Sequence, residues 1–99
     1  MIHYVFTVYD QKAHAYLPPF VLHHKDMATR IFSDCVNSND HQFGRHPADY
    51  TLYCIGEYDD ASGQLIARKH ELLGQGIEFK IVSSPQSDLF EEPELKAVK

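Results

Sequence analysis

The pattern of apolar and polar positions along the chain predicts four extended segments. Residues 2–9 combine β-branched and aromatic side chains, with apolar residues on both faces, which is typical of a central strand. Residues 50–58 and 64–69 also have strand patterns, and the acidic turn over residues 59–63 predicts that they form an antiparallel hairpin. Residues 77–82 alternate between apolar and polar positions, which predicts a last strand.

Between the first strand and the hairpin, the pattern predicts an arm, a helix and a loop. Residues 13–22 are apolar but contain two adjacent prolines, which lack backbone donors, so we expect an edge strand or an extended arm. Residues 26–37 have helical spacing, with Asp26 as the N-cap and Asn37 in the left-handed conformation at the end. Residues 38–49 are rich in Asn, Asp, His, Gly and Pro and predict a loop. The expected apolar face of the helix comprises Met27, Ile31, Phe32, Cys35 and Val36.

These elements predict an α+β fold, a small antiparallel sheet of four to five strands with one amphipathic helix packed on one face. The pattern does not fix the order of the strands, so an OB-like barrel stays open as the alternative. From residue 83 onward the chain is polar, acidic and contains proline, which is typical of a flexible tail. We therefore expect one domain over residues 1–83 and an acidic flexible tail over residues 84–99.

Composition adds a constraint on the partners of this domain. The chain has 99 residues and a formal net charge of −5, which disfavours a generic nucleic-acid binder because phosphate affinity depends on Lys and Arg. Four acidic residues and two lysines follow Ser87, so the rest of the chain is acidic as well. Any site for a polyanion must therefore be a local patch, to which the seven histidines could add positive charge.

The sequence carries no sign of export or of a membrane anchor. Cys35 and Cys54 are too few for a disulfide framework. No apolar run approaches the roughly 20 residues of a membrane helix, and the N-terminus lacks the basic and apolar regions of a signal peptide. We expect a cytoplasmic protein in which both thiols are free.

No pattern in the chain supports catalysis. The spacings of His23, His24, His41 and His46 match no usual structural zinc pattern, so a histidine-based metal site is only a third hypothesis. A Cys–His nucleophile needs a thiol of low pKa, whereas both cysteines lie in patterns typical of structural thiols. The chain has no Gly-rich phosphate loop. We expect no enzyme activity, no cofactor and no metal.

Aromatic residues that interleave with basic ones point to nucleic-acid binding. Single strands bind proteins by stacking bases on aromatic rings while basic groups contact the backbone. We expect basic side chains to contact phosphates and the ring of Phe43 or Tyr16 to stack on a base. The candidate residues are Lys12, Tyr16, Phe43, Arg45, His46, Arg68 and Lys69.

Four segments, in the same order along the chain, resemble a known viral family. They are YDQKAHAYLPPF, ATRIFSDCVN, HQFGRHPADYTLYCIGEYDDASGQL and LGQGIEF. Together they resemble the small nonstructural protein of gokushoviruses, which are tailless single-stranded-DNA bacteriophages of the microvirus group. The resemblance covers roughly residues 3–79. It implies a phage protein made in the bacterial cytoplasm and absent from the virion. It also implies DNA binding, with a part in single-stranded genome synthesis or in the switch from duplex replication. It attaches no catalytic residues.

Two hypotheses about function follow. In the first, the chain is a phage nonstructural protein, a homodimer, that binds single-stranded DNA and is accessory to genome replication. In the second, it is a non-catalytic adaptor that binds phage or host replication proteins. The net acidity, the Tyr-rich surface and the acidic tail motivate the second hypothesis.

Overall fold

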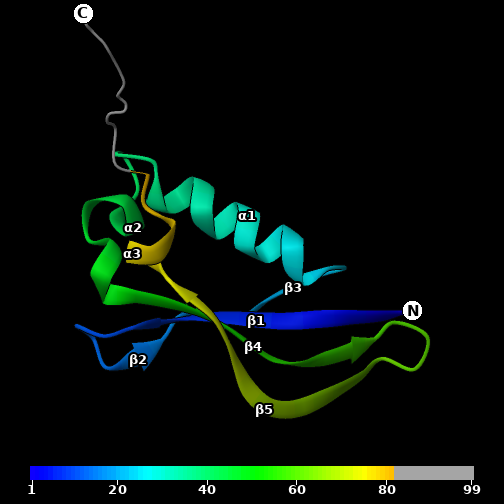
Figure 1. Ribbon diagram of the computed structural model, residues 1–99. Coiled ribbons are helices and arrows are strands. Elements are labelled where there is room, and N and C mark those ends of the chain that lie inside the picture. Colours follow the sequence, from blue (N-terminus) through cyan, green and yellow to red (C-terminus); the bar gives the residue numbers. More distant parts are fainter. Residues whose placement is uncertain (82–99) are drawn as a thin grey trace, which may run out of the picture.

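The computed structural model describes residues 1–81 and contains one open antiparallel sheet of five strands with helices on one side (Figure 1). The strands follow the order β2-β1-β4-β5, and β3 pairs with β1 on the same edge as β2. The α+β prediction is confirmed, and the sheet is open, unlike the barrel considered as the alternative. The strands are β1 (Ile2–Asp10), β2 (Ala15–Tyr16), β3 (Phe20–Leu22), β4 (Tyr50–Asp59) and β5 (Gln64–Gln75). The helical elements are α1 (Lys25–Val36), α2 (Gln42–Arg45), α3 (Gly76–Phe79) and the 3₁₀ turn η1 (Pro47–Asp49).

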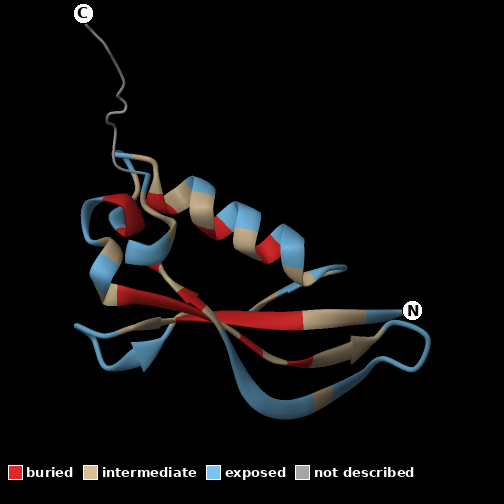
Figure 2. Cartoon of the chain, viewed as in Figure 1, coloured by how far each residue is buried: buried red, intermediate tan, exposed pale blue. Residues whose placement is uncertain are grey.

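The core lies between α1 and one face of the two central strands. Phe6 pairs with Cys54, and Val8 with Leu52, so these four side chains share a face. Ala28, Phe32 and Val36 of α1 pack onto them. Figure 2 shows that the inner strands β1 and β4 are buried over much of their length, whereas β5 is mostly exposed.

Helix α1 is present as predicted, but its ends and its buried face differ from the prediction. It begins at Lys25, and the N-cap residue is His24, so Asp26 lies in the first turn, where its charge favours the helix dipole. The buried positions are Ala28, Phe32 and Val36, whereas Met27 and Ile31 are exposed. The prediction missed this because Ala28 is small and carries a weak hydrophobic signal.

Asn37 ends α1 in a way that the sequence did not predict. Its φ of −93° is not left-handed. Instead, its side-chain Nδ2 donates to the carbonyl oxygens of Ser33 (2.9 Å) and Phe79 (3.0 Å), and its Oδ1 accepts from the amide of Ile81 (2.7 Å). This side chain therefore joins the end of α1 to the segment that contains α3.

The prediction of a last strand over residues 77–82 is wrong, because residues 76–79 form the short helix α3. Gln75 and Glu78 form a capping box at its start. The ring of Phe79 packs against Phe32 at 5.7 Å, while Ile77 is exposed. An apolar alternation over a few residues does not distinguish a strand from one helical turn of which a single residue is buried.

Two further boundaries differ. The region 38–49, predicted as a loop, contains α2 and η1. The amide of Phe43 donates to His41 Nδ1 (3.0 Å) at the start of α2. Strand β5 continues to Gln75, beyond the predicted end at residue 69. The domain boundary at residue 83 and the flexible tail over 84–99 lie outside the described residues. Within residues 1–81, no helix is long and apolar enough to cross a membrane.

Candidate nucleic-acid interface

The sheet face opposite α1, here called the open face, carries a group of aromatic side chains. Thr7 and Tyr9 alternate along β1 with the core residues Phe6 and Val8, so they point to the open face. Tyr53 pairs with Thr7, and Tyr16 pairs with Tyr9. Four rings, here called the aromatic cluster, meet on this face and belong to Tyr9, Tyr16, Tyr53 and His70.

Ring-centroid distances place Tyr16 at the centre of the aromatic cluster. Its ring lies 4.8 Å from that of Tyr9, 6.2 Å from that of Tyr53 and 5.6 Å from that of His70. The rings of Tyr53 and His70 are 5.9 Å apart. Tyr16 is also 50% exposed, so its ring is open to a ligand. Such a cluster presents flat apolar surface together with polar ring edges.

A β-bulge brings His70 into the cluster. Glu71 pairs with Cys54 and Ala67 pairs with Gly56, so residues 68–70 of β5 lie opposite a single residue of β4, Ile55. Extra residues of this kind bend a strand and redirect its side chains. Figure 1 shows the middle of β5 and the short β2 on the side of the sheet away from α1.

The open face is hollowed on both sides of Ile55. One hollow is lined by Thr7, Tyr16, Leu17, Pro18, Pro19, Ile55 and His70. The other is lined by Val5, Ile55, Gly56, Leu65, Ile66 and Ala67. Because the two hollows share Ile55, we describe them as the aromatic half and the apolar half of one trough. A hydrogen bond from Thr7 Oγ1 to the carbonyl oxygen of Leu17 (2.7 Å) holds the proline-containing arm at the aromatic half.

Two of the predicted basic segments adjoin one another at one end of the sheet. Lys12 lies in the turn between β1 and β2, and its side chain is exposed. In the same turn, the amide of Gln11 donates to the carbonyl oxygen of Asp49 in η1 (2.8 Å). Arg45, the last residue of α2, and His46, which follows it, precede η1 directly and are both exposed.

The two predicted basic residues of β5 differ in their surroundings. Arg68 Nη2 contacts Glu57 Oε1 at 3.3 Å. Glu57 pairs with Tyr4, which packs against the core on the α1 side, so this ion pair directs Arg68 away from the open face. Lys69 is exposed and forms no ion pair within residues 1–81. Of the two predicted basic residues of β5, Lys69 is therefore the one that is not paired with a carboxylate within residues 1–81.

Phe43 occupies the core and offers no ring face to a base. It is 8% exposed, and its ring lies 4.5 Å from that of Tyr50 and 5.5 Å from that of Phe32. The structure thus keeps Tyr16 as a stacking candidate and places Phe43 among the residues that stabilise the fold.

Three members of the aromatic cluster were missed at the sequence level. Side chains alternate between the two faces of a strand, so the sequence indicates which residues lie on the same face as Tyr9 or Tyr53. It does not indicate whether that face is covered by other elements. His70 gave no signal, because its position depends on the bulge over residues 68–70, which the sequence pattern does not reveal.

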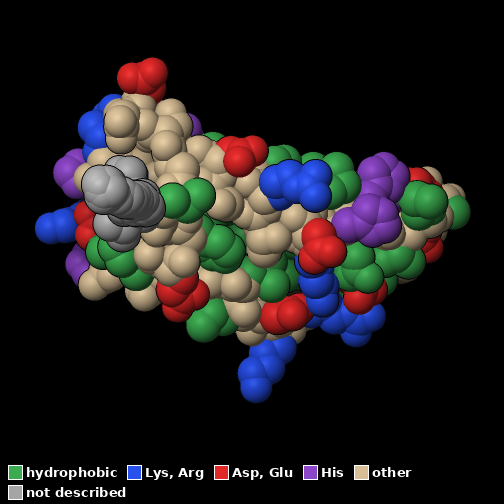
Figure 3. Space-filling view, turned by 45° about the horizontal axis from the view of Figure 1, so that its top comes forward, with side chains coloured by type: hydrophobic (Ala, Val, Ile, Leu, Met, Phe, Trp, Pro, Cys, Tyr) green, Lys and Arg blue, Asp and Glu red, His purple; other side chains and the backbone are tan. Residues whose placement is uncertain are grey.

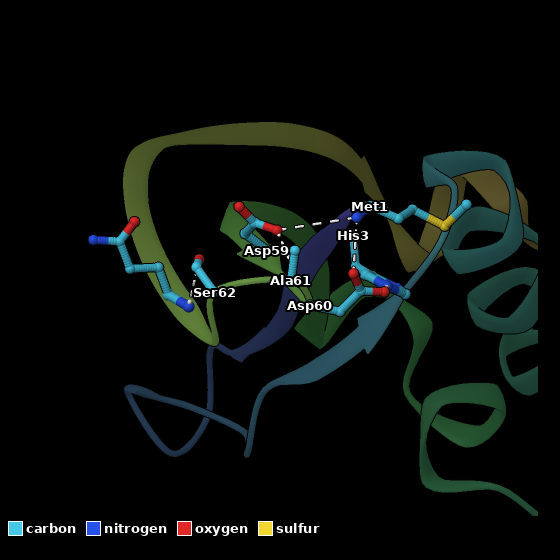
Figure 4. A network of polar contacts seen from close by, with 7 residues as sticks. Met1, His3, Asp59, Asp60, Ala61 and Ser62 are labelled. Atoms are coloured by element: carbon cyan, nitrogen blue, oxygen red, sulfur yellow. Dashed lines mark hydrogen bonds and ion pairs between the residues drawn. The ribbon is translucent and has the colours of Figure 1, made fainter.

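Other polar groups gather at the far end of the sheet, beside the β4–β5 turn (Figure 4). Asp60 accepts hydrogen bonds from the N-terminal amine of Met1 (2.8 Å) and from His3 Nε2 (2.8 Å). These two contacts, the amine first, lower the pKa of Asp60 to about 2. The rings of His3 and His23 lie 4.2 Å apart. Figure 3 shows histidines at both ends of the α1 side, with acidic and basic side chains interspersed between them.

Neither the histidines nor the cysteines form a recognisable reactive site in the described part of the chain. Residues 1–81 contain no group of three or more His, Cys, Asp or Glu side chains placed to hold a metal ion. Burial raises the pKa of both Cys35 and Cys54. A raised pKa favours the protonated thiol, which is the less nucleophilic form.

Fold and site together define a small α+β protein in which one sheet face is covered by helices and the other carries an exposed aromatic cluster. The chain belongs to the Phage ORF5 protein family, whose model matches residues 3–79. It is therefore a phage protein, and the match spans all four residues of the aromatic cluster. No curated protein and no solved structure matches the chain.

Proposed function

We propose that this protein binds single-stranded DNA on the open face of its sheet, in the host cytoplasm, as an accessory to phage genome replication. The observation that carries the proposal is the aromatic cluster centred on Tyr16, which is exposed on a sheet face that no other element covers in the described chain. Aromatic rings on an open sheet or groove are the usual platform for unpaired bases, at about 1–3 kcal/mol per stacked base.

Basic groups near the two edges of the cluster support the proposal. Lys12 lies in the turn beside β2, and Lys69 lies next to His70. Arg45 and His46 adjoin the Lys12 turn through the hydrogen bond between Gln11 and Asp49. In this arrangement the bases stack near Tyr16 and Tyr53, and the phosphates pass the lysines. The resemblance to gokushovirus nonstructural proteins supports the same role.

A titration of a fluorescent single-stranded oligonucleotide at low salt tests the proposal. The wild-type protein is expected to bind, and Tyr16→Ala is expected to weaken binding by about 5-fold to 150-fold, since 1–3 kcal/mol corresponds to that range. Tyr58→Ala, at the far end of the sheet, is the matched control and should bind as the wild type does. An absence of binding at high micromolar protein would refute the proposal.

The second candidate function is a non-catalytic adaptor for phage or host replication proteins. The exposed Leu65 and Leu72 of β5 favour it, because apolar residues on an exposed strand are typical of protein-binding surfaces. It predicts that Leu65→Ser abolishes recovery of a replication protein while DNA binding is absent. DNA binding that depends on Tyr16 would favour the first function instead.

A further inference from the structure

Three of the seven histidines are exposed and lie one or two residues from a lysine or arginine that the proposed function places near the DNA. They are His14, His46 and His70, beside Lys12, Arg45 and Lys69, respectively. No ion pair joins any of these three imidazoles to a carboxylate within residues 1–81. Histidine is the side chain whose charge ordinarily changes between pH 5 and 8, so these positions can add positive charge to the site.

Two tyrosines hold His70 on the open face. Its ring lies edge-on to that of Tyr16, with 82° between the ring planes and 5.6 Å between the centroids, and 5.9 Å from that of Tyr53. The neighbouring carboxylate, Glu71, pairs with Lys25 at 2.8 Å on the α1 side. A proton on His70 therefore adds its charge to that of the preceding lysine, and no paired carboxylate offsets it in the described chain.

At the other basic segments, carboxylates offset the fixed positive charge. Lys12 and Arg45 lie among the side chains of Asp10, Asp40 and Asp49. Asp10 Oδ1 accepts from the amide of Lys12 (3.0 Å), and the carbonyl oxygen of Asp40 accepts from Arg45 Nη1 (3.1 Å). At the left edge of Figure 3, histidine side chains lie beside Lys and Arg side chains. With neutral histidines the carboxylates outnumber the cations, and protonation of the histidine beside each cation reverses this balance.

The backbone at His14 also points to a role for its side chain. Its φ is 54°, in the left-handed region that glycine adopts at the lowest cost. Within residues 1–81 it is the only non-glycine residue with a positive φ. The turn itself is fixed by Asp10 Oδ1, which accepts from the amides of Lys12 and Ala13. The fold therefore does not need an imidazole here, and residues in sparsely populated backbone regions are concentrated at functional sites.

We propose that His14, His46 and His70 are phosphate contacts of the DNA site and that DNA binding takes up protons at these imidazoles. This inference rests on the proposed function and adds His14 and His70 to its phosphate contacts. A phosphate close to an imidazole favours the charged form, and a protonated imidazole donates from both ring nitrogens. Because binding takes up protons, the affinity for DNA rises as the pH falls from 8 to 6.

Titrations of a fluorescent single-stranded oligonucleotide at pH 6 and at pH 8, each over a range of salt concentrations, test the proposal. At pH 8 the lysines and the arginine act alone, so the slope of log affinity against log salt should be about −2. At pH 6 each histidine that contacts a phosphate should steepen the slope by about 0.7, to about −4 for all three.

Variants assign the steepening to these residues. The triple variant His14→Gln/His46→Gln/His70→Gln should keep a slope of about −2 at both pH values. His14→Gly, which suits the left-handed backbone and so should preserve the fold, should lose about a third of the steepening. The matched control is His24→Gln, because His24 is exposed and its side chain makes no capping hydrogen bond. It should behave as the wild type does.

The outcomes separate this inference from the proposed function. Equal wild-type slopes at pH 6 and pH 8 would overturn the inference and leave DNA binding standing. Steepening that persists in the triple variant would also overturn it, because the protons would then bind to other groups. An absence of DNA binding at both pH values would overturn the inference together with the proposed function.

Discussion

At the scale of single residues, a ring can stack on a base only if one of its faces is open to solvent. Tyr16 meets this condition at the centre of the aromatic cluster, and Phe43 does not, because it packs between Phe32 and Tyr50. Both residues lie among basic neighbours in the sequence, so the local pattern cannot separate them. Their roles follow from which face of the sheet each segment covers.

A residue-scale prediction concerns Asp60, whose pKa of about 2 arises from the N-terminal amine and then from His3. Because the folded-state pKa lies below the usual aspartate value of 3.8, these contacts stabilise the fold above about pH 4, and the contribution is lost as the pH falls through about 2. A carboxyl-detected NMR titration should give a midpoint near 2, and His3→Ala should raise it while the amine contact remains. A wild-type midpoint near 3.8 would contradict this interpretation.

At the scale of elements, the strands were easier to predict from sequence than the short helices. Residues 2–9 and 50–58 carry enough β-branched and aromatic residues to define β1 and β4. Helix α3 depends on the capping box of Gln75 and Glu78 and on contacts with α1, which are tertiary features. The aromatic cluster was predicted only at Tyr16, because its other members depend on strand order and on a bulge.

The buried face of α1 gives a prediction at this scale. Phe32→Ala removes a core ring that is 3% exposed, so it should lower the free energy of unfolding by about 3–5 kcal/mol. Ile31→Ala, one position away and 46% exposed, should cost less than about 1 kcal/mol. Urea unfolding of both variants measures the difference. Equal losses would show that the helix packs on the face that includes Ile31.

At the scale of the whole molecule, a net charge of −5 limits the number of phosphates that the protein can contact. Lys12, Arg45 and Lys69 are the candidate phosphate contacts, since Arg68 pairs with Glu57. Each contacted phosphate of a single strand contributes a slope of about −0.7 to the logarithm of affinity against the logarithm of salt concentration, so we expect a slope of about −2. Lys69→Ala should make it shallower by about 0.7.

Lys25→Ala is the control for the salt measurement, because Lys25 pairs with Glu71 at 2.8 Å on the α1 side. It should leave the slope unchanged. A slope much steeper than −2 would require phosphate contacts by basic residues other than Lys12, Arg45 and Lys69.

The oligomeric state is a further prediction for the whole molecule. The outer edge of β5 has no partner strand within residues 1–81, and exposed edges favour pairing between chains. We expect a homodimer, which sedimentation equilibrium over a range of protein concentrations would detect. A monomer mass at every concentration would contradict this prediction and leave the open face as a site on a single chain.

The central claim is that single-stranded DNA binds on the open face, and aromatic-ring NMR during a DNA titration tests it most directly. The chain contains six Tyr and no Trp, so the tyrosine ring signals form a small set. We predict that the signals of Tyr9, Tyr16, Tyr53 and His70 shift together, while those of Tyr4 and Phe43 do not. Shifts confined to residues away from this cluster, or no shifts at saturating DNA, would contradict the account.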